Sequence, residues 1–163
     1  MDAKQAIKLG IDMAAMVCDS YVADLSDDDL MKRPHAGCNH IKWQLGHLIS
    51  SEHSMMAGLY PDAMPALPEG FADRYTKDAA TSDEAAAFDS KEELMRVYKE
   101  QRAATLAALE ACPDEDFDKP GPEAMRDFAP TVGAVFSMQG SHWLMHAGQW
   151  VPIRREAGKD VVI

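Results

Sequence analysis

Two histidines one helical turn apart are suited to binding a metal ion. His142 and His146 are four residues apart, which on a helix places their Cβ atoms about 6 Å from each other and lets both imidazoles reach one ion. They belong to a run that recurs at steps of three and four residues, as on one face of a helix: Val132, Val135, Gln139, His142, His146, Gln149 and Ile153. Such a face is normally buried. Four of its seven side chains are polar and would need hydrogen bonds or an ion.

A third imidazole is available from a second predicted helix. His47 lies at the inner edge of an apolar stripe, next to Leu48 and one turn after Trp43. Gly46 lowers helix propensity by roughly 1 kcal/mol relative to alanine, which indicates a close backbone approach at this point. Three neutral imidazoles from two adjacent helices would leave coordination positions open to water or substrate, as a catalytic metal site requires.

The same residues admit an interpretation without metal. His47, His142 and His146 could instead join Gln139 and Gln149 in a buried hydrogen-bond network with ordered water. A single His-x-x-x-His pair is frequent by chance, so the spacing alone leaves both interpretations open.

Glu52 lies on the inward stripe near His47 and also has two interpretations. In the structural one, its carboxylate is the partner of an arginine or a tyrosine. In the functional one, it accepts the N–H of a ligand imidazole or acts as a general base. A structure with no carboxylate near the open coordination position would favour a protein that binds without turnover.

Four further residues are expected in a pocket or hydrogen-bonded behind the ligands. His40 is about 10 Å from His47 along the helix axis, too far to share its metal. We expect His40 to make hydrogen bonds at the helix start, with contact to substrate as the alternative. Trp43 is expected in the core or in a pocket wall. Gln139 and Gln149 are expected beside the two C-terminal histidines.

Helices must position these residues, because the hydropathy pattern predicts an all-α protein. Apolar residues recur at helical spacing in four segments, without sustained period-two alternation. The expected helices are residues 3–22, a second from an N-cap at Asn39 to Tyr60, a third opened by a Ser-x-x-Glu capping box at Ser90 and ending at 111, and a fourth from an N-cap at Thr131 to 157. A short helical turn is expected over 26–30. Helices of this length are about 30 Å long, which favours a four-helix bundle, one domain over residues 1–163.

The connections leave the helix order open. Residues 61–89 form the longest irregular stretch, and a connection of this length is more often a binding or lid element than a passive link. It is long enough to cross the end of the bundle, so a simple up-down-up-down order is not required. A second connection, 113–130, is rich in proline and acidic residues.

Composition excludes several classes of function. The 163 residues carry 16 Lys plus Arg against 27 Asp plus Glu, a net charge of −11, so nucleic acid and anionic membranes are not expected as partners. Cys18, Cys38 and Cys112 form no CxxC pair, which argues against a disulfide framework or a thiolate zinc site. The N-terminus does not resemble a signal peptide, and no stretch approaches the ~20 apolar residues of a membrane span. We expect a cytoplasmic protein.

Two segments resemble the motifs of the DinB/YfiT-like superfamily. Residues 39–48, with Glu52 after them, look like its first motif, and residues 142–149, followed by two arginines, look like its His-x-x-x-His-x-Gly-Gln motif. Residues 26–34 also resemble the family's link between its first two helices. The resemblance implies a four-helix bundle with a divalent metal, zinc, nickel or iron, held by His47, His142 and His146.

The resemblance also implies an activity. Relatives with an assigned activity are thiol-dependent: S-transferases that attach bacillithiol or mycothiol to electrophiles, and a mycothiol-dependent maleylpyruvate isomerase. Several relatives form homodimers, so a homodimer acting on a small molecule is expected. The first hypothesis is therefore an enzyme in which the metal binds a low-molecular-weight thiol as its thiolate, which attacks an electrophile held under the 61–89 connection. A variant uses metal-bound hydroxide for hydrolysis. The alternative is a stress-associated protein that binds metal or ligand without turnover.

Overall fold

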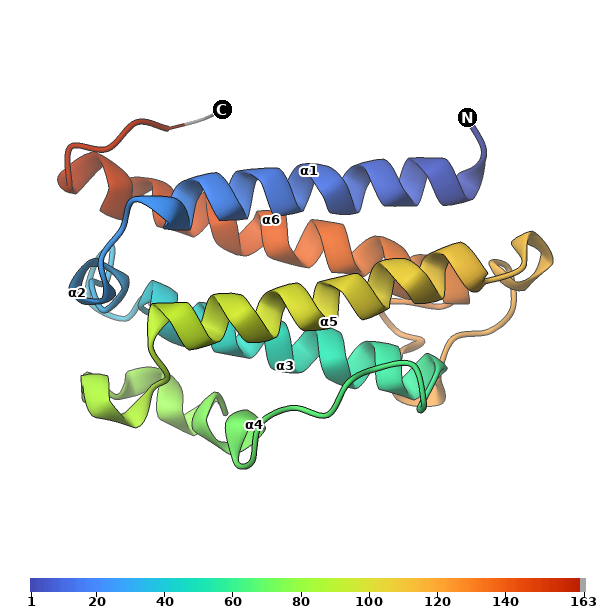
Figure 1. Ribbon diagram of the computed structural model, residues 1–163, viewed down its shortest axis with the longest axis horizontal. Coiled ribbons are helices and arrows are strands. Elements are labelled where there is room, and N and C mark those ends of the chain that lie inside the picture. Colours follow the sequence, from blue (N-terminus) through green and yellow to red (C-terminus); the bar gives the residue numbers. More distant parts are fainter. Residues whose placement is uncertain (162–163) are drawn as a thin grey trace.

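Four long helices make the frame of the protein, shown by a computed structural model that describes residues 1–161 (Figure 1). They are α1 (Ala3–Ala23), α3 (Ile41–Leu59), α5 (Lys91–Ala111) and α6 (Val132–Glu156). Two short helices, α2 (Asp27–Leu30) and α4 (Phe71–Arg74), lie in the connections, together with 3-10 turns at Asp78–Thr81, Ala85–Ala87, Asp114–Asp116 and Glu123–Met125. Residues 1–161 contain no strand. The expected all-α bundle is confirmed.

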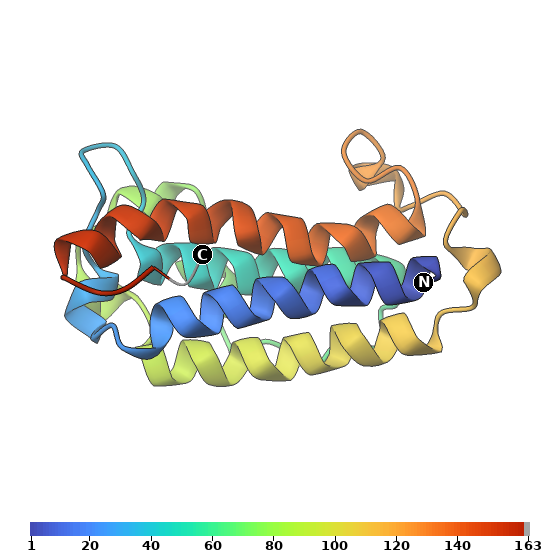
Figure 2. The same cartoon turned by 90° about the horizontal axis from the view of Figure 1, so that it is seen from above.

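The bundle consists of two parallel pairs of helices. In Figures 1 and 2, α1 and α6 run side by side in one direction, and α3 and α5 run side by side in the other. The chain between α3 and α5 returns along the length of the bundle before α5 begins (Figure 1). The long connection therefore gives an order other than up-down-up-down, and it makes α3 an antiparallel neighbour of α6.

Local hydrogen bonds explain where the helices start. Thr131 caps α6 as expected, since its side chain accepts the N–H of Ala134. Ser90 caps α5 by accepting the N–H of Glu93, but the reciprocal half of the expected capping box is not formed and the Glu93 carboxylate pairs with an arginine instead. The expected N-cap of α3 was wrong by one residue.

His40, rather than Asn39, caps α3. Its Nδ1 accepts the N–H of Trp43 at 3.0 Å. Burial lowers the pKa of His40 to about 4, so the ring stays neutral and Nδ1 keeps the lone pair that a cap needs. Its other nitrogen lies 3.2 Å from the carbonyl oxygen of Ser82. This contact ties residues 61–89, called the first long connection below, to the start of α3.

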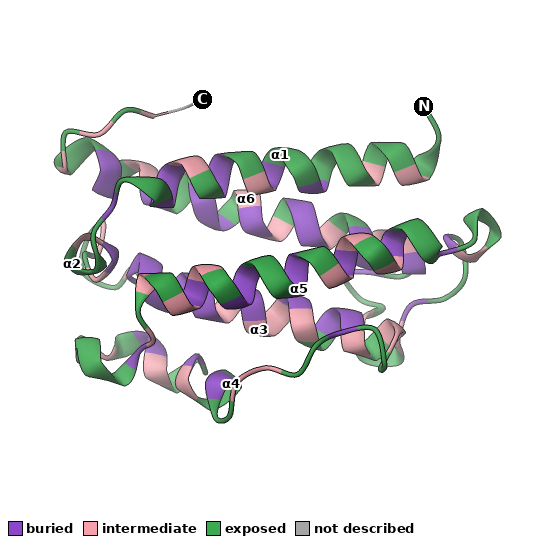
Figure 3. Ribbon diagram, viewed as in Figure 1, coloured by how far each residue is buried: buried purple, intermediate pink, exposed green. Residues whose placement is uncertain are grey.

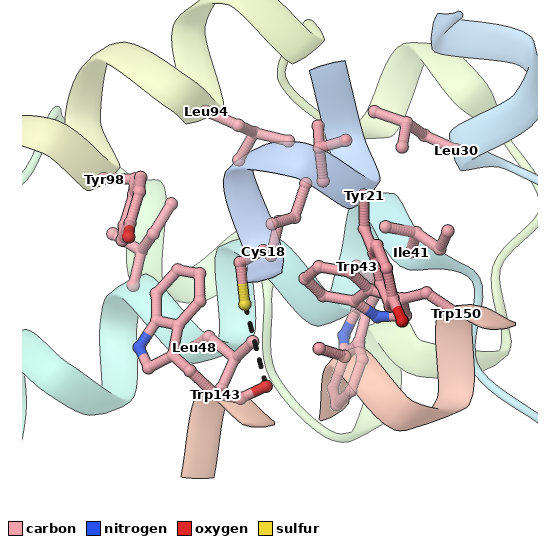
Figure 4. Packing of buried hydrophobic residues seen from close by; sticks show 14 of the residues in the cluster. Cys18, Tyr21, Leu30, Ile41, Trp43, Leu48, Leu94, Tyr98, Trp143 and Trp150 are labelled. Carbon is pink, nitrogen blue, oxygen red and sulfur yellow. Dashed lines mark hydrogen bonds between the residues drawn. The ribbon is translucent and has the colours of Figure 1, made fainter. Parts of the chain in front are cut away.

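The inner faces of the four helices form the core (Figure 3). Trp143 and Trp150 of α6 are almost fully buried and pack among side chains of α1, α3 and α5 (Figure 4). The α1 and α6 backbones approach closely where Gly10 meets Gly140, because a Cβ on Gly140 would lie 2.9 Å from the carbonyl group of Gly10. Within residues 1–161, no helix combines the length and the apolar character that crossing a membrane demands.

The connection between α3 and α5 is anchored directly over Gly46. A Cβ on this glycine would collide with the ring of Tyr75, so the close approach expected at Gly46 is made by an aromatic side chain rather than by a backbone. The Tyr75 hydroxyl donates to the carboxylate of Asp89 at 2.9 Å and accepts its N–H at 3.0 Å. Arg74 also pairs with Asp89. These contacts hold α4 against α3 at Gly46, the residue before His47.

Candidate metal centre

The fold brings the three histidines of the sequence motifs together. One ligand nitrogen from each of His47, His142 and His146 lies within 4.8 Å of the others, and the ring centroids are 5.0 to 5.5 Å apart. These three residues are called the histidine cluster below. Three nitrogens bound tetrahedrally to one ion at about 2.1 Å are roughly 3.4 Å apart, so nitrogens that lie within 4.8 Å of one another would have to draw together by at most about 1.4 Å to bind it. The donor set therefore fits a divalent metal.

The electrostatic environment keeps the histidine cluster neutral. Burial lowers the pKa of His47 and of His146 to about 4, and repulsion by the other rings acts in the same direction. Burial also lowers the pKa of His142. Neutral imidazole is the form that binds metal, so at pH 7 no proton has to leave these rings before an ion enters.

Gln44 determines which nitrogen of His146 is free to bind. Its Oε1 lies 2.9 Å from Nδ1 of His146 and also accepts the indole N–H of Trp150 at 2.9 Å. An indole nitrogen can only donate, so the atom that faces both groups is the amide oxygen. The Nδ1 of His146 therefore carries the proton, and its Nε2 presents a lone pair to a metal.

Sequence patterns alone did not single out Gln44. A signal was present, because Gln44 is a polar residue on the buried side of its helix, one turn before His47. Its side-chain NH₂ donates to the carbonyl of Asn39 at 2.7 Å, which holds the amide in place.

Trp43 packs against His47, the ligand that α3 contributes to the histidine cluster. Its ring stacks on that of His47 with centroids 4.9 Å apart and planes only 7° from parallel. The indole N–H donates to the carbonyl of Thr76 in the first long connection. Trp43 is thus a core residue, the first of its two expected roles, and it packs directly on a candidate ligand.

Glu52 has the arginine partner that the structural interpretation expects. Its buried carboxylate accepts hydrogen bonds from Thr105 and from the indole N–H of Trp143, and it pairs with Arg102 at 2.8 Å. Burial raises its pKa, and Arg102 opposes this shift. No hydrogen bond found among residues 1–161 joins Glu52 to the histidine cluster. The structure gives no support to a direct role as base, and Glu52 instead holds Trp143, the neighbour of His142.

A pocket of about 710 Å³ opens beside the histidine cluster. The first long connection, expected to cover the substrate, contributes only Ala72, whereas the second connection supplies Ala124, Met125 and Phe128. The remaining lining residues come from α3 and α6 and are His47, Ser50, Ser51, Ser54, Met55, Met138, His142 and Met145. The pocket thus gives a small molecule access to the exposed side of the cluster.

Comparison with known proteins identifies the family. A model of the DinB superfamily matches residues 11–150. The chain belongs to the DinB superfamily. A crystal structure described as that of a conserved protein of locus from Enterococcus faecalis has the same fold as this DinB chain, with a TM-score of 0.71 and 18% identity over 98% of this chain and 99% of that one. A search of curated proteins finds no match.

Two other expected site residues of this DinB bundle have different surroundings. Gln139 is buried, and its NH₂ donates to the carbonyl of Val135 at 2.8 Å, while its Oε1 has no hydrogen-bond partner among the described residues. Gln149 is exposed, so its expected place in a buried network was wrong. The reason is the position of the buried face: it is centred on Trp143 and Trp150 along the whole of α6, so His142 lies half-buried at its edge and Gln149 lies outside it.

Proposed function

We propose that this DinB-superfamily protein is an enzyme that uses one divalent metal ion, zinc, nickel or iron, and transfers a low-molecular-weight thiol to an electrophile. The observation that carries the proposal is the histidine cluster itself, three neutral imidazoles whose nitrogens lie within 4.8 Å of one another beside a pocket of about 710 Å³. A divalent ion held there supplies a positive centre that lowers the pKa of a bound thiol or water. Homodimeric assembly belongs to the same proposal.

The chain's own residues divide the remaining work. His47, His142 and His146 bind the ion, and Gln44 keeps the Nε2 of His146 turned toward it. Trp43 covers one face of the His47 ring and excludes water from that side. The pocket holds the electrophile next to His47 and His142. Orientation of the reactants beside the metal is then the protein's main contribution to rate.

The pocket favours thiol transfer over hydrolysis. No carboxylate belongs to its lining within residues 1–161, and Glu52 is engaged elsewhere. A thiol has a pKa of about 8.5, so a nearby cation is enough to deprotonate it near neutral pH. Water starts from a pKa of about 15.7 and profits more from a protein base.

A protein that binds metal or ligand without turnover is the second candidate. The same observation, a pocket lining without a carboxylate in the described residues, favours it, because no general base is at hand. The two candidates share the metal site and differ in catalysis.

Metal analysis coupled to a turnover assay tests both. Wild-type protein is reconstituted with zinc, nickel or iron beside His146→Ala and the control His35→Ala, which removes an exposed histidine outside the cluster. We expect one ion per chain in wild type and control, a loss of most metal with a near-native fold in His146→Ala, and thiol-dependent consumption of an electrophile only where metal is bound. Stoichiometric metal without turnover for any thiol and electrophile pair would favour the second candidate. Absence of metal binding in the wild type would refute both.

A further inference from the structure

One wall of the pocket presents hydroxyl groups. Ser50, Ser51 and Ser54 follow His47 by three, four and seven residues, so they continue the same face of α3 away from the histidine cluster. The hydroxyl oxygen of Ser50 is buried and has no hydrogen-bond partner among the described residues. A buried hydroxyl without a partner is costly, and rotation of the Ser50 side chain to another rotamer would offer this hydroxyl to a polar group held in the pocket.

The remaining walls are apolar and adaptable. Met138 and Met145 come from α6, and Met125 and Phe128 come from the second connection. Met145 is 59% exposed and Phe128 is 55% exposed, which is unusual for large apolar side chains unless they serve an interface or a ligand. Thioethers adjust to ligands of different shape because they are unbranched and flexible.

Charged side chains are missing from this lining. Within residues 1–161, the pocket has no Lys, Arg, Asp or Glu in its walls, although 26% of the chain is charged. A hollow beside α5, by contrast, is lined by Asp27, Lys91, Glu92, Met95, Arg96 and Lys99. A charged ligand group placed in the pocket would lose hydration without gaining a counter-charge. The net charge of −11 adds a general repulsion of anions.

We propose that the ligand of this pocket is uncharged apart from the one atom that meets the histidine cluster. It has an apolar body, aromatic or alkyl, that lies against the methionines and Phe128, and hydroxyl, ether or amide groups that face the serines. Carboxylates, sulfonates and phosphates on the body of the ligand are rejected. That this ligand is the electrophilic substrate rests on the proposed function, whereas the selectivity is a property of the pocket walls alone.

Two fluorescent dyes that differ by one sulfonate test the selectivity on metal-free protein. The neutral dye is N-phenyl-1-naphthylamine, and the anionic dye is 8-anilinonaphthalene-1-sulfonate. Both become fluorescent in apolar surroundings, so titration gives their dissociation constants directly. We expect the neutral dye to bind at least about tenfold more tightly, a difference of about 1.4 kcal/mol.

A matched pair of lysine variants locates the effect. Met145→Lys adds a cation to the pocket wall, and Met16→Lys adds one to α1, outside this pocket. Both methionines are about half exposed, at 59% and 49%, so neither replacement disturbs the core. We expect Met145→Lys to reduce the preference for the neutral dye about tenfold and Met16→Lys to leave it unchanged.

The results separate this inference from the proposed function. Equal affinity of the wild type for both dyes, or equal effects of the two lysine variants, would overturn the inference. Because no metal is present in the titration, the dye preference can hold while metal analysis fails, and it can fail while metal analysis succeeds.

Discussion

Replacing Gln44 by methionine removes the amide oxygen that serves two donors, the rings of His146 and Trp150, beside the candidate metal centre. In the native protein this oxygen lies 2.9 Å from Nδ1 of His146 and 2.9 Å from the indole nitrogen of Trp150. Methionine has nearly the length and volume of glutamine, so the packing of α3 is retained. The effect of Gln44→Met therefore falls on the hydrogen bonds.

The magnitude follows from the groups that lose their partner. The indole N–H of Trp150 would stay in a fully buried place without an acceptor, at a cost of about 1–3 kcal/mol. His146 could avoid the same cost by moving its proton to Nε2, but that nitrogen would then be unable to bind metal. We expect the free energy of unfolding to fall by about 2–4 kcal/mol. The metal affinity should fall about 10–100-fold, as found when a partner of a metal-binding histidine is removed.

Urea unfolding and competition with a chromogenic chelator measure the two quantities. Gln149→Met is the matched control, since it makes the same replacement at an exposed glutamine of α6 and should change neither quantity. Unchanged metal affinity in Gln44→Met would refute the assigned tautomer of His146. Unchanged stability would show that the indole of Trp150 does not depend on this acceptor.

Three further predictions concern the frame of the site. Glu52→Ala leaves Arg102 buried without its carboxylate and should lower the free energy of unfolding by about 3–5 kcal/mol in urea; a loss below about 1 kcal/mol would contradict the buried ion pair. Gly46→Ala should lower the free energy of unfolding by about 1–3 kcal/mol, because the new Cβ meets the Tyr75 ring. Gly148→Ala has open space around it and should raise the free energy of unfolding by up to about 1 kcal/mol. Melting temperatures that change in the same direction in both variants would disprove the close contact at Gly46. Burial lowers the pKa of the histidine cluster, so the unfolded chain binds more protons than the folded protein in this pH range. The metal-free protein should therefore lose stability as the pH falls from 6.5 toward about 4. Constant stability over this range would count against buried neutral rings.

The helices were predictable from the sequence because their signals are local. Apolar spacing and capping residues gave 3–22 and 131–157 for helices that span Ala3–Ala23 and Val132–Glu156. The pairing of α1 with α6 as parallel neighbours could not be derived in this way. It depends on the path of the connection before α5, and a chain of that length can take more than one path.

The candidate site was predictable only in part. The spacing of the histidines brought out the residues that the fold then places together. The role of Gln44 depends on a partner 102 residues away in the chain, and no local pattern encodes such a contact. The burial of Gln149 was predicted wrongly because steps of three and four residues fit two overlapping faces of α6, and the buried one is centred on Trp143 and Trp150. The contribution of Phe128 to the pocket was missed because connections have no periodicity to interpret.

The histidine cluster and part of its pocket belong to different parts of the fold. The three histidines stand on α3 and α6, inside the packed frame, whereas Ala124, Met125 and Phe128 belong to a surface connection. Surface connections accept replacement, insertion and deletion far more readily than packed helices do. Exchange of residues 113–130 between relatives should therefore change which ligands the pocket prefers and leave the metal affinity of the histidine cluster unchanged. The candidate metal centre would then stay fixed on the packed helices, while the connection beside it sets which ligands the pocket accepts.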